Sequence, residues 1–73
     1  MNKGYVVQVM GPVVDVEFPD SLPSLQNLLL AEKKDGSSVA LEVAQMLGGN
    51  RVRTIALDST DGLIRKTRVQ DTG

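Results

Sequence analysis

The sequence predicts an all-β domain, a small closed barrel of six strands joined by tight turns. Its apolar runs are short and rich in β-branched residues, which favours strands over helices. Several runs alternate apolar and polar residues, as expected for a sheet with one buried face. Closure is favoured because it removes the exposed edges of a small sheet. Residue pairs typical of tight turns separate the runs, at Gly11-Pro12, Asp35-Gly36, Gly48-Gly49 and Asp61-Gly62.

One segment does not fit a strand pattern alone. The leucines of residues 22–31 match helical spacing as well as a buried strand. We favour one short helical turn followed by a short strand in this segment. The expected strands are residues 5–10, 13–18, the second part of 22–31, 39–47, 51–57 and 63–69.

The composition allows a single domain over residues 1–73. Hydrophobic residues make up 41% of the chain, and Tyr5 and Phe18 are its only aromatic residues. The core must therefore consist mainly of aliphatic side chains, although the pattern leaves the buried face of the first strand open. The expected core residues are Val7, Val9, Val14, Val16, Leu41, Val43, Ile55, Leu57 and Ile64.

The absence of two residue types removes most catalytic chemistry. Without cysteine or histidine the chain has no thiol nucleophile, no Ser-His-Asp arrangement, no disulfide and none of the usual structural zinc sites. The Gly48-Gly49 pair lacks the Gly-Lys-Ser/Thr sequence of a phosphate-binding loop. Asp15 and Glu17 are expected on a solvated strand face. We therefore expect no catalytic, cofactor-binding or metal-binding residues, and no enzyme activity from this chain alone.

Arginines are the candidate functional residues. Arg51, Arg53, Arg65 and Arg68 belong to two successive expected strands, and they would share one patch if those strands paired. Such a patch could contact an acidic partner surface. We favour the alternative that it is an ordinary charged sheet exterior that prevents edge pairing, because the net charge of −1 shows no basic bias.

Four blocks of the sequence are distinctive, namely residues 6–16 (VVQVMGPVVDV), 41–48 (LEVAQMLG), 52–57 (VRTIAL) with 60–65 (TDGLIR), and 69–73 (VQDTG). Together they resemble the start of the catalytic β subunit of F-type ATP synthases. The blocks span nearly the whole chain in the right order. Two departures are Met46, where family members often have histidine, and Lys66, where a glycine commonly follows the arginine. The stretch 30–39 is also shorter than in many members.

The resemblance implies an N-terminal six-stranded barrel that acts as a structural, oligomerisation module. In that family, barrels of alternating α and β subunits form a crown that holds the catalytic hexamer together. The complex makes or hydrolyses ATP coupled to proton transport, and it lies on the cytoplasmic side of the membrane without direct insertion of this domain. Nucleotide binding belongs to the next domain, and residues 70–73 resemble the junction to it. The implied subunit interface includes the charged exterior near Arg51, Arg53, Arg65 and Arg68.

The sequence leaves two other behaviours of the barrel open, nucleic-acid binding and homodimer formation. Small β-barrels often bind nucleic acids, but scarce aromatic residues and the lack of positive charge argue against this alternative. An isolated barrel could also form a homodimer through exposed edges or an exchanged hairpin.

Overall fold

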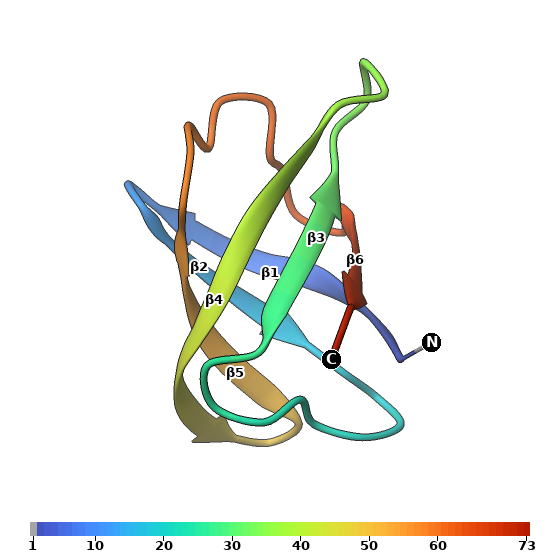
Figure 1. Cartoon of the computed structure of the whole chain (residues 1–73), viewed down its shortest axis with the longest axis vertical. Helices are drawn as coiled ribbons and strands as arrows, with labels where there is room; N and C mark the ends of the chain where they lie inside the picture. Colours follow the sequence, from blue (N-terminus) through green and yellow to red (C-terminus); the bar gives the residue numbers. More distant parts are fainter. Residues whose placement is uncertain (1) are drawn as a thin grey trace.

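The computed structural model describes residues 2–73 and shows a closed antiparallel barrel (Figure 1). Its strands are β1 (Lys3–Met10), β2 (Val13–Glu17), β3 (Leu28–Glu32), β4 (Ser38–Gly48), β5 (Arg51–Ala56) and β6 (Arg68–Asp71). Neighbouring strands follow the order β1-β2-β5-β4-β3-β6, and β6 pairs with β1 to close the sheet. The predicted all-β, closed six-stranded barrel is therefore confirmed. Met1, the first residue of the expected domain, lies outside the described residues.

Aliphatic side chains from all six strands fill the barrel interior, and Phe18 is the one aromatic ring among them. Thr54 also points inward, and its hydroxyl donates a hydrogen bond of 2.8 Å to the carbonyl oxygen of Val14, so this buried polar group is satisfied. Four of the residues expected in the core are 0–1% exposed, namely Val14, Val16, Leu41 and Val43. The other buried hydrophobic residues are Val6, Phe18, Leu29, Ala31, Val39, Val52, Leu63 and Val69.

A bulge in β1 determines which of its valines face the core. Val6 pairs with Val16 on β2, but the next pair begins at Gln8, so Val7 is an extra residue in the ladder. Val6 is fully buried, and Val9 is half-buried against the core. Val7 is half-buried and lines a hollow on the outer surface. The expectation that Val7 belongs to the core is wrong, because strict alternation does not hold across a bulge.

Three further residues expected in the core lie on the surface. Ile55, Leu57 and Ile64 are 40%, 55% and 49% exposed, respectively. Val52 and Thr54 are the inward residues of β5, so alternation turns Ile55 outward. Leu57 follows the end of β5, and Ile64 lies in the connection to β6. The expectation was wrong because it took apolar character alone as the sign of burial.

The segment before β3 contains a turn and no helix. The amide of Asn27 donates to the carbonyl oxygen of Ser24 at 3.2 Å, and Gln26 has a φ of 69°, outside the helical region. The amide of Gln26 also donates to the carbonyl oxygen of Val43 at 2.8 Å, which draws the segment toward β4. The expected helical turn within residues 22–31 is therefore wrong, since residues 2–73 contain no helix.

The last expected strand, residues 63–69, is a turn over most of its length. The amide of Leu63 donates to the carbonyl oxygen of Thr60 at 3.0 Å. The amide of Thr67 donates to the carbonyl oxygen of Ile64 at 3.1 Å. Leu63 is only 7% exposed and covers one part of the core. Strand β6 therefore starts at Arg68, and the connection before it is held by turn hydrogen bonds.

Replacing Lys66 with glycine is expected to stabilise the barrel by about 1 kcal/mol. Lys66 has a φ of 72°, a left-handed conformation that strains a side chain with a Cβ but not glycine. Urea unfolding of Lys66→Gly measures the gain, with Lys66→Ala as the control that removes the charge and keeps the strain. Equal stability of the two variants would contradict the explanation.

The last residues pack along β3. The amide and the hydroxyl of Thr72 both donate to the carbonyl oxygen of Leu28, at 3.1 and 2.6 Å. The side-chain amide of Asn27 donates to a carboxylate oxygen of Asp71 at 3.3 Å. These hydrogen bonds hold residues 71 and 72 against the barrel.

Candidate assembly surface

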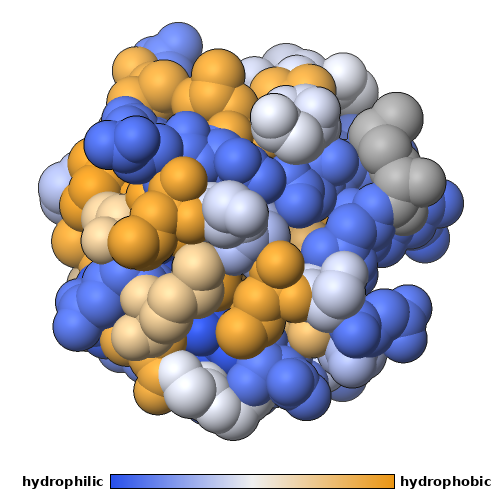
Figure 2. Space-filling view, turned by 60° about the horizontal axis from the view of Figure 1, so that its bottom comes forward, coloured by the Kyte–Doolittle hydropathy of each residue, from blue (hydrophilic) through white to orange (hydrophobic). Residues whose placement is uncertain are grey.

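The outer surface of the barrel is where a partner can bind, because core side chains occupy the interior. Figure 2 shows apolar side chains gathered in patches between hydrophilic ones on the face that lies at the bottom of Figure 1. The register of the strands assigns the exposed residues to two different surfaces, one charged and one apolar.

The charged surface lies over β2 and β5, which are neighbours in the sheet. Arg53 donates from Nε and Nη2 to the two carboxylate oxygens of Asp15, at 2.9 and 3.0 Å. Asp15 is only 5% exposed, so the expectation that it lies on a solvated face is wrong. Arg51 donates from Nε to Glu17 at 3.0 Å. Two of the four candidate arginines are thus engaged by carboxylates of the adjacent strand.

Glu17 accepts a second hydrogen bond, from the hydroxyl of Tyr5 at 2.6 Å. This bond, together with the one from Arg51, lowers the pKa of Glu17 below its ordinary value of 4.5, because both stabilise the carboxylate. The hydrogen bond between Tyr5 and Glu17 also raises the pKa of Tyr5, because it holds the phenol proton between the hydroxyl oxygen of Tyr5 and a carboxylate oxygen of Glu17. The three residues join β1, β2 and β5 across the outer surface.

The lowered pKa of Glu17 predicts a loss of stability in acid. A carboxylate with a pKa lower in the folded than in the unfolded chain stabilises the fold above its unfolded pKa, and this contribution is lost as the pH falls through the folded value. We expect Glu17→Gln to remove part of the decline in unfolding free energy below pH 4.5. Urea unfolding across the acid range measures this, with Glu42→Gln as the control. Identical acid profiles for wild type and Glu17→Gln would contradict the prediction.

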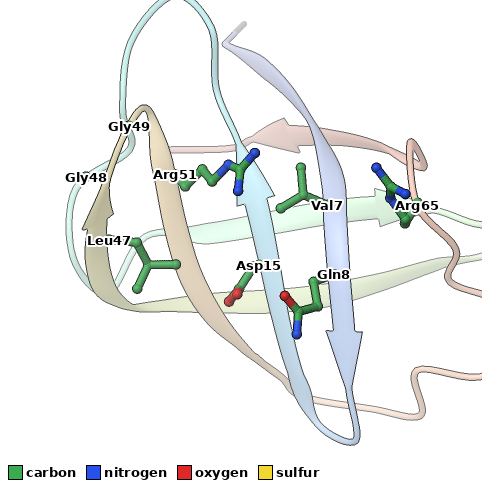
Figure 3. Close-up of a pocket in the computed structure, with 8 residues that line it drawn as sticks. All are labelled: Val7, Gln8, Asp15, Leu47, Gly48, Gly49, Arg51 and Arg65. Carbon is green, nitrogen blue, oxygen red and sulfur yellow. The ribbon is translucent and has the colours of Figure 1, made fainter.

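The other two arginines lie apart from this pair, because β5 and β6 are not neighbours in the sheet. Arg68 on β6 pairs in register with Tyr5 and is exposed. Arg65 comes from the connection before β6 and lies across β1 from Arg51 (Figure 3). The condition for a shared patch of the four arginines, pairing of the last two strands, is therefore not met.

Arg51 and Arg65 nevertheless line one shared depression in the outer surface. We call it the basic hollow; Figure 3 shows its lining residues, which include two apolar side chains, Val7 of the β1 bulge and Leu47 at the end of β4. The basic hollow is lined by Val7, Gln8, Asp15, Leu47, Gly48, Gly49, Arg51 and Arg65.

An apolar surface on the other strands was missed by the sequence analysis. Leu28, Glu42 and Ile55 form one row across β3, β4 and β5. Leu30 and Ala40 form the next row, and the amide of Leu57 donates to the carbonyl oxygen of Ala40 at 2.9 Å. The four large side chains here are 40–55% exposed. We call this set the apolar face: Leu28, Leu30, Ala40, Ile55 and Leu57 around Glu42.

The sequence did contain a signal for this face. Leu28-Leu29-Leu30 is apolar at three consecutive positions, so a strand there must expose apolar side chains on its outer side. Contiguous exposed apolar surface of this kind marks interaction sites in soluble proteins.

Metal and membrane features are limited within the part of the chain that the structure describes. Residues 2–73 contain no group of three or more His, Cys, Asp or Glu side chains arranged to hold a metal ion. Among the same residues, no helix is long and apolar enough to cross a membrane.

A comparison with known protein families matches nearly the whole barrel. Residues 6–73 match the family described as "ATP synthase alpha/beta family, beta-barrel domain". The match starts within β1 and includes all the other strands, so it covers the core, the charged surface and the apolar face described above. The chain belongs to the ATP synthase alpha/beta family, and residues 6–73 are its β-barrel domain.

Proposed function

We propose that this chain is the N-terminal barrel of a catalytic β subunit of an F-type ATP synthase and works there as an oligomerisation module. The family match supports the part of the proposal that concerns the barrel domain. The four sequence blocks that resemble the β subunit support the choice of the β subunit over the α subunit. Block 6–16 lies in the β1–β2 hairpin and blocks 41–48 and 52–57 lie in the β4–β5 hairpin, and the two hairpins pair through β2 and β5.

The partners of the domain in this role are the N-terminal barrels of the neighbouring α subunits. The barrel presents surfaces of different character on different strands, as a subunit with two unlike neighbours requires. The charged exterior with Arg51, Arg53, Arg65 and Arg68 contributes to these contacts. The domain belongs to a peripheral complex on the cytoplasmic side of the membrane and does not itself insert.

ATP turnover in the complex is the work of other domains. The 73 residues comprise the barrel domain of the family and no catalytic domain. The role of the barrel is to hold neighbouring subunits together while the domains attached to it change conformation.

Nucleic-acid binding receives less support from the geometry. Arg51 and Arg53 already bind Glu17 and Asp15, so these guanidinium groups are partly neutralised. Tyr5, one of two aromatic residues, is half-buried and holds Glu17, while Phe18 is fully buried. The barrel surface therefore lacks the exposed aromatic rings on which single strands stack.

The proposal is tested by mixing this chain with separately purified α-type and β-type barrels of an F-type ATP synthase. We expect the chain to bind the α-type barrel more tightly than the β-type barrel, as measured by light scattering during size-exclusion chromatography. Preference for the β-type barrel would assign the chain to the α subunit instead. Binding to neither barrel would overturn the proposed role.

A further inference from the structure

The end of β3, the turn that follows it and the connection before β6 form a second hollow in the surface. Its volume is about 390 Å³, and it brings together residues from two distant parts of the sequence. Four of its seven lining residues are cations, and one is a carboxylate. We call this hollow the lysine pocket, and it is lined by Glu32, Lys33, Lys34, Ile64, Arg65, Lys66 and Thr67.

The charge of the lysine pocket differs from that of the whole chain. Its lining residues carry a formal charge of +3, whereas the net charge of the chain is −1. Among residues 2–73 the ion pairs are those of Arg51 and Arg53, so none of the four cations of the pocket is paired. Asp35 and Asp61 line a neighbouring hollow, and neither lies within ion-pair distance of a lysine. Cations gathered in this way attract anions.

Lys66 is held in a strained conformation at this pocket. Its φ of 72° lies in the left-handed region, which is unfavourable for a residue with a long side chain. Two hydrogen bonds to Val6 fix this segment. The amide of Lys66 donates to the carbonyl oxygen of Val6 at 2.7 Å, and the amide of Val6 donates to the carbonyl oxygen of Thr67 at 2.9 Å. Strained residues cluster at ligand-binding sites, so a lysine at a position that favours glycine points to a role for its charge.

We propose that the lysine pocket binds a small anion that contains linked phosphate groups, such as pyrophosphate or tripolyphosphate. Lys33 and Lys34 line the pocket from the β3–β4 side, and Arg65 and Lys66 line it from the connection before β6. A guanidinium binds two phosphate oxygens at once, and an ammonium acts as a point charge. A ligand with several charged centres can engage both sides, which a single phosphate group does less well. This binding role is separate from the proposed assembly function.

The remaining donors favour phosphate over a nucleoside. The hydroxyl oxygen of Thr67 accepts from the amide of Ile64 at 3.1 Å, so its own proton is left to donate to a phosphate oxygen. Lys33 uses one ammonium proton for the carbonyl oxygen of Ser59, at 3.3 Å, and keeps two. No aromatic side chain lines the pocket, so a nucleobase would find no ring on which to stack.

The test is a titration of the 73-residue chain with tripolyphosphate at constant ionic strength, followed by proton–nitrogen NMR. We expect the amide signals of residues 32–34 and 64–67 to shift with one common dissociation constant. Lys66→Ala removes one charge and is expected to weaken binding about fivefold, the upper value for one exposed charge pair. Lys66→Arg keeps the charge and should bind nearly as tightly as the wild type.

Two further variants separate binding from stability and from general attraction. Lys66→Gly removes the strain, so it should resist urea better than the wild type and yet lose affinity for tripolyphosphate as Lys66→Ala does. A purely structural role for Lys66 would not change stability and affinity in opposite directions. Lys3→Ala removes an exposed lysine of β1 outside the pocket and should leave the affinity unchanged.

A comparison of ligands identifies the source of the phosphate groups. Equal affinity for tripolyphosphate and ATP would support a pocket that recognises linked phosphates on any carrier. Tighter binding of ATP, with shifts at the same residues, would support a nucleoside triphosphate as the ligand, and adenosine alone should not bind in either case.

Two results would overturn the inference. One is the absence of shifts at residues 64–67 when tripolyphosphate is added. The other is an affinity that Lys3→Ala lowers as much as Lys66→Ala does, because binding would then reflect general attraction between charges. Neither result bears on the assembly role, which is measured separately by the binding of one barrel to another.

Discussion

Replacing Val16 with aspartate is expected to abolish folding of the barrel. Val16 is fully buried in the middle of β2, and its partners in register, Val6 and Val52, are fully buried as well. A carboxylate at this position would lose its water among aliphatic side chains, and the inward hydroxyl of Thr54 already donates to the carbonyl oxygen of Val14. The cost is several kcal/mol, comparable to the total stability of about 4–11 kcal/mol expected for a domain of this length.

The measurement is the dispersion of amide signals in a proton–nitrogen NMR spectrum, together with circular dichroism. Ile55→Asp is the matched control, because it introduces the same carboxylate on the neighbouring strand β5 but at an exposed position. We expect Ile55→Asp to keep the spectrum of a folded barrel. A folded Val16→Asp variant, or an unfolded Ile55→Asp variant, would show that the inward and outward faces of these strands are assigned wrongly.

The contrast between Val16 and Ile55 also shows what the sequence could and could not predict. In β2, Val14 and Val16 alternate with carboxylates, so the polar residues fix which face is buried. In β5, the inward position between Val52 and Ala56 is Thr54, and apolar Ile55 points outward. The pattern predicted the strand correctly but assigned the wrong residues to its buried face. A threonine can be buried when its hydroxyl bonds to a nearby carbonyl oxygen, and apolar character does not reveal this.

The fold class was more predictable than the details of single strands. Turn-forming glycine pairs and short β-branched runs are local signals, so they indicated strands and turns without knowledge of the pairing. The bulge at Val7 and the left-handed conformations at Gln26 and Lys66 depend on contacts with other segments. The amide of Lys66, for example, donates to the carbonyl oxygen of Val6 at 2.7 Å, a contact that no local pattern reveals.

The candidate assembly surface was predicted only in part for a related reason. Arg51 and Arg53 could be identified as surface residues, but their ion pairs require β2 and β5 to be neighbours, and these strands are far apart in sequence. A patch shared by the four arginines depended on pairing of the last two strands, and β5 and β6 are not neighbours in the sheet. The apolar face needs the register of three strands at once, so it emerged only from the structure.

Replacing Gly4 with alanine is expected to destabilise the barrel by about 3 kcal/mol, the upper part of the range for an overpacked core. A Cβ added at Gly4 would overlap the backbone carbonyl oxygen of Glu17 and would lie 2.9 Å from the ring of Phe18. The backbone atom cannot turn aside as a side chain can. Strands β1 and β2 would therefore have to separate beside the Tyr5–Glu17 pair.

Urea unfolding of Gly4→Ala, alone and combined with Phe18→Leu, distinguishes the clash with the carbonyl oxygen of Glu17 from the clash with the ring of Phe18. Phe18→Leu frees the space near the ring but leaves the carbonyl oxygen of Glu17 in place. We therefore expect the double variant to be less stable than Phe18→Leu by nearly the full cost of Gly4→Ala. If Phe18→Leu instead cancelled that cost, the ring alone would be the obstacle. Glycine would then be required at position 4 by the shape of the core rather than by the close approach of two strands.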